Sequence, residues 1–383
     1  MQKLVTAICL LIAMSISAQD VQLKSNKTIT PSAAYDFKTI IDIEASAVKS
    51  QGRTGTCWSF STTSFIESEI YRQTGKSIDL SEMYTVRATY YQKAWNYVMR
   101  QGKTQFSEGG LAHDMINATK SHGLVTEEAY SGLLNGATRH DHSTIVPTLK
   151  KVLDVYIAEQ NHSDEWKKEV SSILDEKLGA DIEEFAYEGK IYTPESFLKM
   201  TGINPDDYVT ITSFNHIPYY NSFVLNIPDN FSNGSFYNVP LEELHKITMA
   251  SLEKGYTVEW DGDVSEKTFS SRHGVAVVPA KKEQTEIALK QMVNEIDVTP
   301  EFRQQEFENY NTTDDHLMHI MGLVKDQEGN IYYKIKNSWG ANSDRVGNGG
   351  YIYMSESYFK LKSISVMVHK DVLSDELKKK LHI

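Results

Sequence analysis

Cysteine is nearly absent from this chain, because Cys9 and Cys57 are the two cysteines among its 383 residues. The first lies in an apolar run, residues 4–14, that follows a lysine and precedes small residues ending at Ala18. This pattern is typical of a secretory signal cleaved near Ala18, and the run is shorter than the roughly 20 apolar residues of a membrane span. We therefore expect residues 1–18 to be removed during export to the periplasm or the medium. Cys57 would then be the sole cysteine, and no internal disulfide could form.

Basic residues are also in deficit. Lysine and arginine together number 39 against 51 aspartates and glutamates, a formal net charge of −12. Such a charge disfavours nucleic acids and anionic membrane surfaces, so neither is expected as a partner. The sequence also lacks internal repeats and low-complexity blocks. Its 40% hydrophobic and 23% charged residues are typical of a soluble globular protein, and its length suffices for two hydrophobic cores.

An unpaired cysteine in an exported protein is open to oxidation, so the presence of Cys57 needs a reason. One alternative is an inert, buried cysteine that packs as a small hydrophobe. Apolar residues recur at helical spacing after Trp58, which predicts a helix that begins near Cys57. A helix N-terminus stabilises a thiolate, so we expect a lowered pKa for this thiol. Six residues upstream, Gln51 offers side-chain N–H donors that could stabilise an oxyanion together with the Cys57 backbone N–H.

A base for this thiol is expected on a β-hairpin late in the chain. Residues 319–325 and 331–337 have strand patterns, and a polar turn separates them. A turn centred on Glu328 places His319 opposite Asn337, close enough for the asparagine oxygen to accept the imidazole N–H. A one-residue bulge would shift this register.

A metal site is the alternative for the histidines of this segment. His316 and His319 could bind a metal ion with help from Asp314 and Asp315. Nothing else in the sequence completes such a site, so we expect neither a metal nor a cofactor.

Taken together, Gln51, Cys57–Trp58, His319 and Asn337–Ser338–Trp339–Gly340 stand in the order and contexts of papain-like cysteine peptidases, which this chain resembles. The resemblance implies that Cys57 attacks the scissile carbonyl as a thiolate and that His319 is its ion-pair partner and later proton donor. It also implies that Asn337 orients His319, that Gln51 binds the oxyanion and that Trp339 shields the histidine–asparagine hydrogen bond from water.

Two departures indicate a branch of this family. Thr54 stands where secreted papains carry a disulfide cysteine, and His319 lies much farther from Cys57 than the roughly 130–150 residues of the papain and cathepsin pattern. A cysteine-poor, expanded chain resembles the bleomycin hydrolase and aminopeptidase C branch. That resemblance implies a peptide substrate, an aminopeptidase or short-peptide peptidase, and a possible homo-oligomer.

Three other functions stay open at this point. The same residues could serve an endopeptidase with an open cleft, transfer an acyl group to an amine instead of water, or remain in a non-catalytic peptide-binding protein. In the resembled branch a C-terminal arm enters the cleft and restricts the enzyme to chain ends. Here Ser374 is expected to cap a short terminal helix. If Ile383 reached the cleft, its carboxylate would meet the free amine of the substrate, and single residues would be released.

The predicted fold class is α+β, in a papain-like arrangement of two domains. A polar leader, 19–34, precedes a mostly helical left domain, 35–205, which carries Cys57 and a helical insertion at about 136–205. A β-barrel-like right domain, 206–383, carries His319, Asn337 and the C-terminal tail. The cleft is expected between the two domains.

The predicted substrate-binding residues are Gly109, Gly110, Trp58 and Trp339. The two glycines lack a Cβ, so an extended peptide could approach their backbone and pair with it as an added strand. The alternative for this glycine pair is an ordinary turn.

Overall fold

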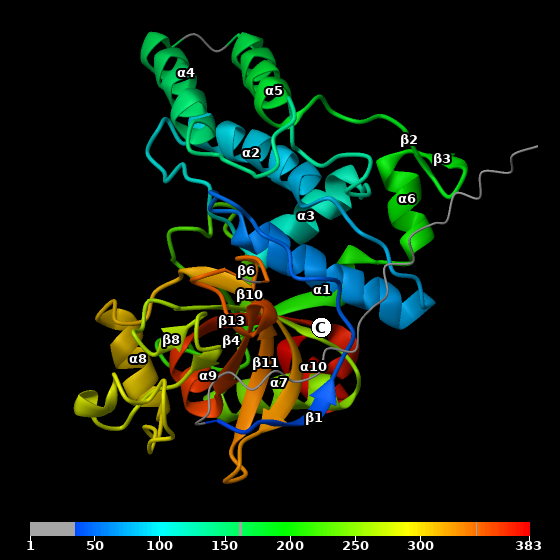
Figure 1. Cartoon of the computed structure of the whole chain (residues 1–383). Helices are drawn as coiled ribbons and strands as arrows, with labels where there is room; N and C mark the ends of the chain where they lie inside the picture. The colour runs from blue at the N-terminus through cyan, green and yellow to red at the C-terminus, as the bar shows by residue number, and fades with distance from the viewer. Residues whose placement is uncertain (1–34, 161–162, 342) are drawn as a thin grey trace, which may run out of the picture.

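The computed structural model describes residues 35–160, 163–341 and 343–383. The predicted signal peptide, its cleavage near Ala18 and the polar leader 19–34 lie outside these residues. The described chain has a helical part and a part built on one large mixed sheet, which confirms the predicted α+β class (Figure 1).

Helices dominate up to residue 201, as the sequence predicted. The helix expected at Cys57 begins at that residue, and the helical insertion expected at about 136–205 contains helices at 145–159, 165–178 and 194–201. Besides a short hairpin, the elements are α1 (Cys57–Thr74), α2 (Glu82–Met99), α3 (Ala112–His122), α4 (Ile145–Glu159), α5 (Glu165–Leu178) and α6 (Pro194–Thr201). The hairpin is formed by β2 (Phe185–Tyr187) and β3 (Lys190–Tyr192).

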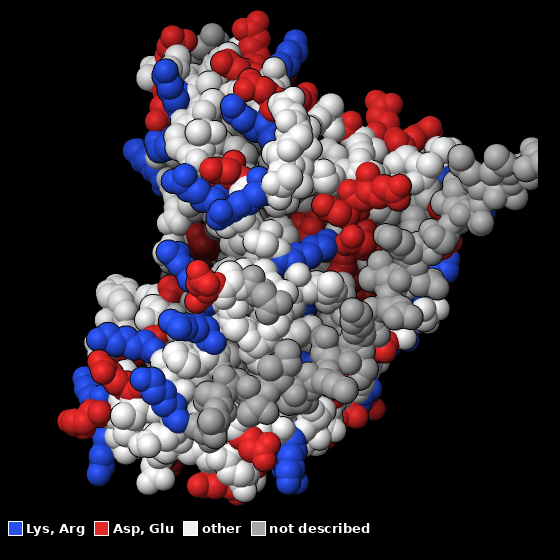
Figure 2. Space-filling model, in the orientation of Figure 1, with Lys and Arg blue, Asp and Glu red and all other residues white. Residues whose placement is uncertain are grey.

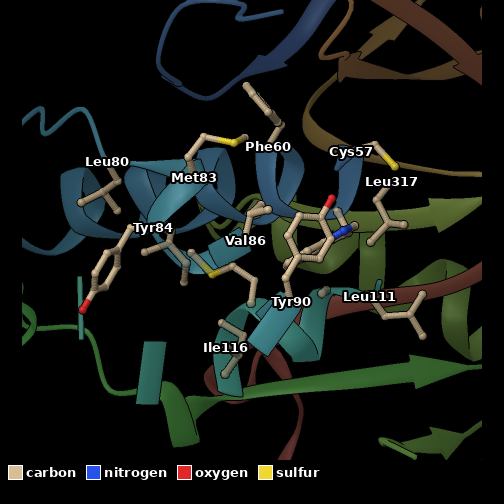
Figure 3. Packing of buried hydrophobic residues seen from close by; sticks show 14 of the residues in the cluster. Cys57, Phe60, Leu80, Met83, Tyr84, Val86, Tyr90, Leu111, Ile116 and Leu317 are labelled. Carbon is tan, nitrogen blue, oxygen red and sulfur yellow. The ribbon is translucent and has the colours of Figure 1, made fainter. Parts of the chain in front are cut away.

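Helix α1 lies between α2 and α3 on one side and the sheet on the other (Figure 1). Every residue from Cys57 to Ile70 is therefore buried, polar ones included. Its apolar side chains join the larger core cluster, in which Cys57 and Leu317 lie next to each other at one end (Figure 3).

The large sheet contains eleven strands, and its order is β5-β6-β4-β13-β7-β10-β11-β12-β9-β8, with β1 paired to β10 beside this path. Within the described residues it is open at β5 and β8, so the barrel-like part is an open sheet. Its strands are β1 (Lys38–Asp42), β4 (Tyr208–Thr212), β5 (Ser222–Val224), β6 (Ser235–Asn238), β7 (Val258–Gly262), β8 (Phe269–Ser270), β9 (Val275–Ala276), β10 (His316–Lys325), β11 (Ile331–Lys336), β12 (Tyr351–Ser355) and β13 (Ser363–His369).

The two faces of this sheet have different cores, because successive side chains of a strand point to opposite faces. On β10, Leu317 joins the cluster around α1, whereas Met318 and Ile320 join a second cluster on the other face. That second face packs against α7 (Leu241–Glu253) and against the side chains of Leu377 and Leu381. The remaining helices are α8 (Pro300–Glu308), α9 (Glu356–Lys362), α10 (Asp375–Leu381) and the short 3₁₀ turns η1 (Pro205–Asp207), η2 (Lys282–Gln284), η3 (Asn348–Gly350) and η4 (Lys370–Val372).

The C-terminal helix α10 forms as predicted, with the Ser374 side chain accepting a hydrogen bond from the Leu377 backbone N–H at 3.2 Å. Its end folds back on itself, because Ile383 N–H donates to Lys378 O at 3.0 Å. Leu377 and Leu381 are buried on the α7 side of the sheet. Helix α10 is therefore anchored on the face of the sheet opposite α1.

The β10–β11 hairpin contains a bulge that the sequence did not reveal. The predicted register holds from Lys325 back to Gly322, which pairs with Lys334, but shifts by one residue at Met321. Gly322 also lies against the carbonyl oxygen of Ile41 on β1, where a Cβ would clash. Beyond the bulge His319 faces Lys336, so the predicted pairing of His319 with Asn337 is wrong.

No described helix is long and apolar enough to cross a membrane. Within the same residues, no group of three or more His, Cys, Asp or Glu side chains is arranged to hold a metal ion.

Candidate active site

The thiol of Cys57 lies at the start of α1, where the cysteine is 7% exposed. The Leu317 backbone N–H donates a hydrogen bond to its sulfur, which ties the helix end to β10. Burial nevertheless raises the pKa of the thiol to about 12, and the nearby carboxylates of Asp314, Asp229 and Asp261 act in the same direction. The expected lowering of this pKa is therefore wrong, because desolvation and three converging carboxylates outweigh the helix end.

His316, the first residue of β10, is the histidine beside Asn337. Its Nε2 lies 2.8 Å from Asn337 Oδ1, and the Ser338 backbone N–H donates to the same oxygen at 2.7 Å. Since that oxygen is an acceptor, His316 Nε2 carries the proton, and Nδ1 holds the free lone pair. Burial lowers the pKa of His316 to about 4, so the imidazole is neutral at physiological pH.

Trp339 covers this histidine. The two rings are 4.7 Å apart between centroids and are inclined by 32°. The indole is 38% exposed, so one face remains available to a ligand. The sequence assigned this shielding to a pair formed by His319, and the structure places His316 there instead.

His319 lies under α1, away from this site. It is fully buried, and its Nδ1 is 2.8 Å from Ser64 Oγ, which also accepts a hydrogen bond from Lys336 Nζ. Residues three apart on a strand point to opposite faces, which separates His319 from His316. Burial and the neighbouring Lys336 ammonium hold the pKa of His319 well below its ordinary value. The predicted placement of His319 at the thiol is therefore corrected to His316.

Gln51 is fixed by its neighbours on both sides. Its Oε1 accepts from Ser338 Oγ at 2.6 Å, and its Nε2 donates to Thr54 O at 2.7 Å. One Nε2 hydrogen remains, and no hydrogen bond of the described residues uses the Cys57 backbone N–H. An open groove of about 470 Å³ begins here, and its lining includes Gln51, Arg53 and Trp339.

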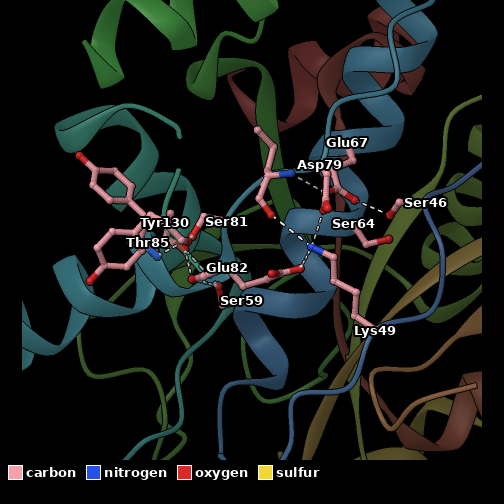
Figure 4. Close-up of polar contacts among 12 residues, drawn as sticks. Ser46, Lys49, Ser59, Ser64, Glu67, Asp79, Ser81, Glu82, Thr85 and Tyr130 are labelled. Carbon is pink, nitrogen blue, oxygen red and sulfur yellow. Dashed lines mark hydrogen bonds and ion pairs between the residues drawn. The ribbon is translucent and has the colours of Figure 1, made fainter. Parts of the chain in front are cut away.

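The segment that leads to Gln51 is anchored by a partly buried polar network (Figure 4). Lys49 Nζ pairs with Asp79 Oδ1 at 2.6 Å and with Glu82 Oε1 at 2.8 Å. Glu67 on α1 accepts hydrogen bonds from the Leu80 backbone N–H and from Ser46 Oγ. These contacts join the extended chain before Gln51 to α1 and α2, so the loop and the thiol are held by the same framework.

The glycine pair lies against α1 through Trp58. Trp58 is fully buried, donates its Nε1 hydrogen to Glu108 O at 3.1 Å and packs its ring on Gly110. It therefore supports the glycine segment rather than lining a surface for substrate, which corrects its predicted role. Lys93 Nζ donates to Gly109 O, so that carbonyl is already used. No hydrogen bond of the described residues involves the backbone of Gly110, so this is the glycine whose backbone groups remain for a peptide.

The structure therefore brings together Cys57, Asn337, Gln51, Trp339 and the predicted glycines, with His316 in place of His319. Sequence reasoning missed the acidic residues around the thiol. Asp314 precedes β10, Asp261 pairs with Leu317 in the sheet register, and Asp229 belongs to a loop after β5. Only Asp314 had a local signal, its position two residues before His316.

Comparisons with known proteins agree with this geometry. The model of the Peptidase C1-like family matches residues 103–383. Aminopeptidase C of Lactococcus lactis subsp. cremoris is 23% identical over 383 aligned residues, which cover 88% of this chain and 83% of the relative. Aminopeptidase E of Lactobacillus helveticus is 25% identical, with 89% and 84% covered.

A crystal structure of PepW from Lactobacillus rhamnosis HN001 superposes with a TM-score of 0.68 at 20% identity, and covers 90% of this chain and 84% of PepW. This match supports the fold. The comparisons confirm the predicted resemblance to papain-like cysteine peptidases and to the aminopeptidase C branch. This chain belongs to the Peptidase C1-like family.

Proposed function

We propose that the protein is a cysteine aminopeptidase in which Cys57 is the nucleophile, His316 the base and Asn337 the residue that orients the base. The observation that carries the proposal is the hydrogen bond from His316 Nε2 to Asn337 Oδ1. This hydrogen bond leaves the lone pair of His316 Nδ1 free. The next residue, Leu317, contacts the Cys57 thiol through its backbone N–H.

In the first half-reaction, Cys57 Sγ transfers its proton to His316 Nδ1 as the sulfur attacks the scissile carbonyl carbon. The carbonyl oxygen becomes an oxyanion, which accepts hydrogen bonds from the free Nε2 hydrogen of Gln51 and the Cys57 backbone N–H. The imidazolium then donates its proton to the leaving nitrogen, and the C–N bond breaks. An acyl-enzyme thioester and an amine remain.

In the second half-reaction, water attacks the thioester while His316 Nδ1 takes one water proton. The tetrahedral intermediate collapses, the C–S bond breaks, and the proton returns to the sulfur. The neutral thiol and imidazole of the resting site suit this cycle, because the proton crosses only when the nucleophile attacks.

The names and lengths of the relatives favour removal of residues from the N-terminus, since these aminopeptidases align over more than four-fifths of their own chains. One observation keeps the endopeptidase as a second candidate: Leu377 and Leu381 hold helix α10 on the α7 side of the sheet, the face opposite α1. Acyl transfer to an added amine would use the same site. A non-catalytic peptide-binding protein would bind peptides without turnover.

Time-resolved digestion of a long unstructured peptide tests the proposal. We expect a ladder of products shortened one residue at a time from the N-terminus, and no turnover by Cys57→Ala. Early internal fragments would favour the endopeptidase, and products carrying an added amine would reveal acyl transfer. Peptide binding by the wild type without any cleavage would refute the catalytic proposal.

We also propose export of the protein after cleavage of residues 1–18, which rests on the sequence pattern alone. The protein recovered from outside the cytoplasm is then expected to begin at Gln19 and to be present as a monomer or a homo-oligomer. N-terminal sequencing and light scattering measure the two properties. A mature chain that retains residues 1–18 would contradict export by cleavage.

A further inference from the structure

Asp229 covers the glycine segment beside the thiol. A Cβ built on Gly109 would overlap the Asp229 carboxylate, so the side chain lies directly on that backbone. Gln105 Nε2 and Ser107 Oγ donate to Asp229 Oδ1, at 2.9 and 3.3 Å. Both bonds use the same oxygen, so Oδ2 remains available to a further donor.

The carboxylate of Asp229 has Lys93 as a nearby cation but makes no direct ion pair with it. No ion pair within 4 Å of its carboxylate occurs in the described part of the chain, and the nearby Lys93 Nζ is directed to the carbonyls of Ser107 and Gly109. Burial raises the pKa of Asp229, the charge of Lys93 acts in the opposite direction, and a bound cation would lower this pKa further. The site therefore favours a ligand that brings its own positive charge.

Two more acidic side chains lie near the thiol, and they are paired with each other. Asp261 is 1% exposed, and its side chain is hydrogen-bonded to that of Asp314, so the two carboxyl groups share a proton. Both residues lie near the thiol, since Asp261 pairs with Leu317 and Asp314 precedes His316. Figure 2 shows a hollow between the helical part and the sheet part, with acidic atoms set back inside it.

We propose that Asp229 binds the free α-ammonium group of the peptide substrate through Oδ2. Because its carboxylate covers Gly109, it also blocks the part of the cleft that would hold residues preceding that ammonium group. Gly110 would then offer the last free backbone groups for the substrate, and a residue preceding the ammonium would collide with the carboxylate. The inference rests on the proposed function. It explains release of residues from the N-terminus of a substrate without a role for the C-terminus of the enzyme.

The test compares leucyl-4-methylcoumaryl amide with its N-acetylated form. The wild type is expected to hydrolyse the free-amine substrate with much the higher kcat/KM. Asp229→Asn keeps the shape of the side chain but removes its charge. It should lower kcat/KM for the free amine by about ten- to a hundredfold, the effect of losing one charge-assisted hydrogen bond, and leave the acetylated substrate unchanged or improved.

Controls separate specificity from folding and from the proposed function. Asp206→Asn removes an exposed carboxylate that pairs with Lys120, and should leave the substrate ratio unchanged. A single cooperative urea-unfolding transition reports that each variant is folded. If Asp229→Asn does not fold, Gln105→Ala removes the 2.9 Å hydrogen bond that orients Asp229, and should also reduce the ratio.

An unchanged ratio in folded Asp229→Asn, or a wild type that accepts both substrates equally, overturns the inference while leaving a peptidase. Failure of the wild type to hydrolyse either substrate or any peptide would overturn the proposed function itself.

Discussion

The imidazole of His316 is oriented by a single acceptor, because Asn337 Oδ1 takes its Nε2 hydrogen while Trp339 covers the ring. His319, three residues along, has a hydroxyl partner and a neighbouring ammonium group but no access to the cleft. At the scale of single residues, the two histidines have the same side chain and differ in where the ring is held: Asn337 holds His316 at the site, and Ser64 holds His319 under α1.

The first prediction compares these histidines. His316→Ala is expected to lower kcat/KM by about a thousandfold or more, since it removes the base. His319→Ala should keep kcat/KM within about tenfold but lower the free energy of unfolding by about 1–3 kcal/mol, because Ser64 loses a buried hydrogen-bond partner. Steady-state kinetics and urea unfolding measure the two effects. The opposite ranking of activity would restore His319 as the base.

The second prediction concerns the reactivity of Cys57. The carboxylate of Asp229 raises the pKa of this thiol, so Asp229→Asn should lower the pKa and increase the thiolate fraction at a fixed pH. Alkylation by iodoacetamide at pH 7.5 should therefore become faster, by about tenfold for each pKa unit. Asp206→Asn serves as the control. Slower alkylation would mean that Asp229 does not act on the thiol through its charge.

At the scale of elements, the bulge at Met321 decides which histidine enters the site. Apolar periodicity predicted α1 and the helices up to residue 201, because that signal is local in the sequence. The bulge depends instead on β1, whose Ile41 carbonyl presses on Gly322 from a distant part of the chain. No pattern within the hairpin encodes that contact, which is why the predicted register failed after four pairs.

The same distinction explains the chemistry around the thiol. Gln51, Cys57 and Asn337 were recognisable because their neighbours in the sequence are distinctive. Asp229 and Asp261 have no such neighbours, and they approach Cys57 only through the topology of the sheet and its loops. Sequence reasoning could therefore find the groups of the site but not the charge that surrounds them.

The third prediction tests Glu127, a half-buried acid beside the Lys49 network. Burial and nearby Glu82 raise the pKa of Glu127 from 4.5 to about 8. A carboxyl whose pKa is raised by folding contributes stability below pH 4.5 and loses it as the pH rises through 8. Glu127→Gln avoids this loss, so its stability relative to the wild type should improve by more than about 1 kcal/mol from pH 4 to pH 9. Urea unfolding at both pH values measures this change, and a constant difference would contradict the assigned pKa.

At the scale of the whole molecule, Leu377 and Leu381 fix helix α10 to the core, whereas Ile383 is 38% exposed. The fourth prediction is that removal of residues 382–383 leaves the pattern of peptide products unchanged, whereas Leu377→Ala lowers the free energy of unfolding by about 2–5 kcal/mol. Product analysis and urea unfolding check the two parts. New internal cleavage after the two-residue truncation would mean that the terminus gates the cleft.

The burial of α1 between the other helices and the sheet has a consequence for how the protein folds. Neither part alone can cover a helix whose first fourteen residues are all buried, so separate halves would expose Phe65 and Ile66 to water. Folding should therefore be cooperative across the chain, with one unfolding transition. The nucleophile would become shielded from oxidants in the same step that assembles the histidine and asparagine beside it.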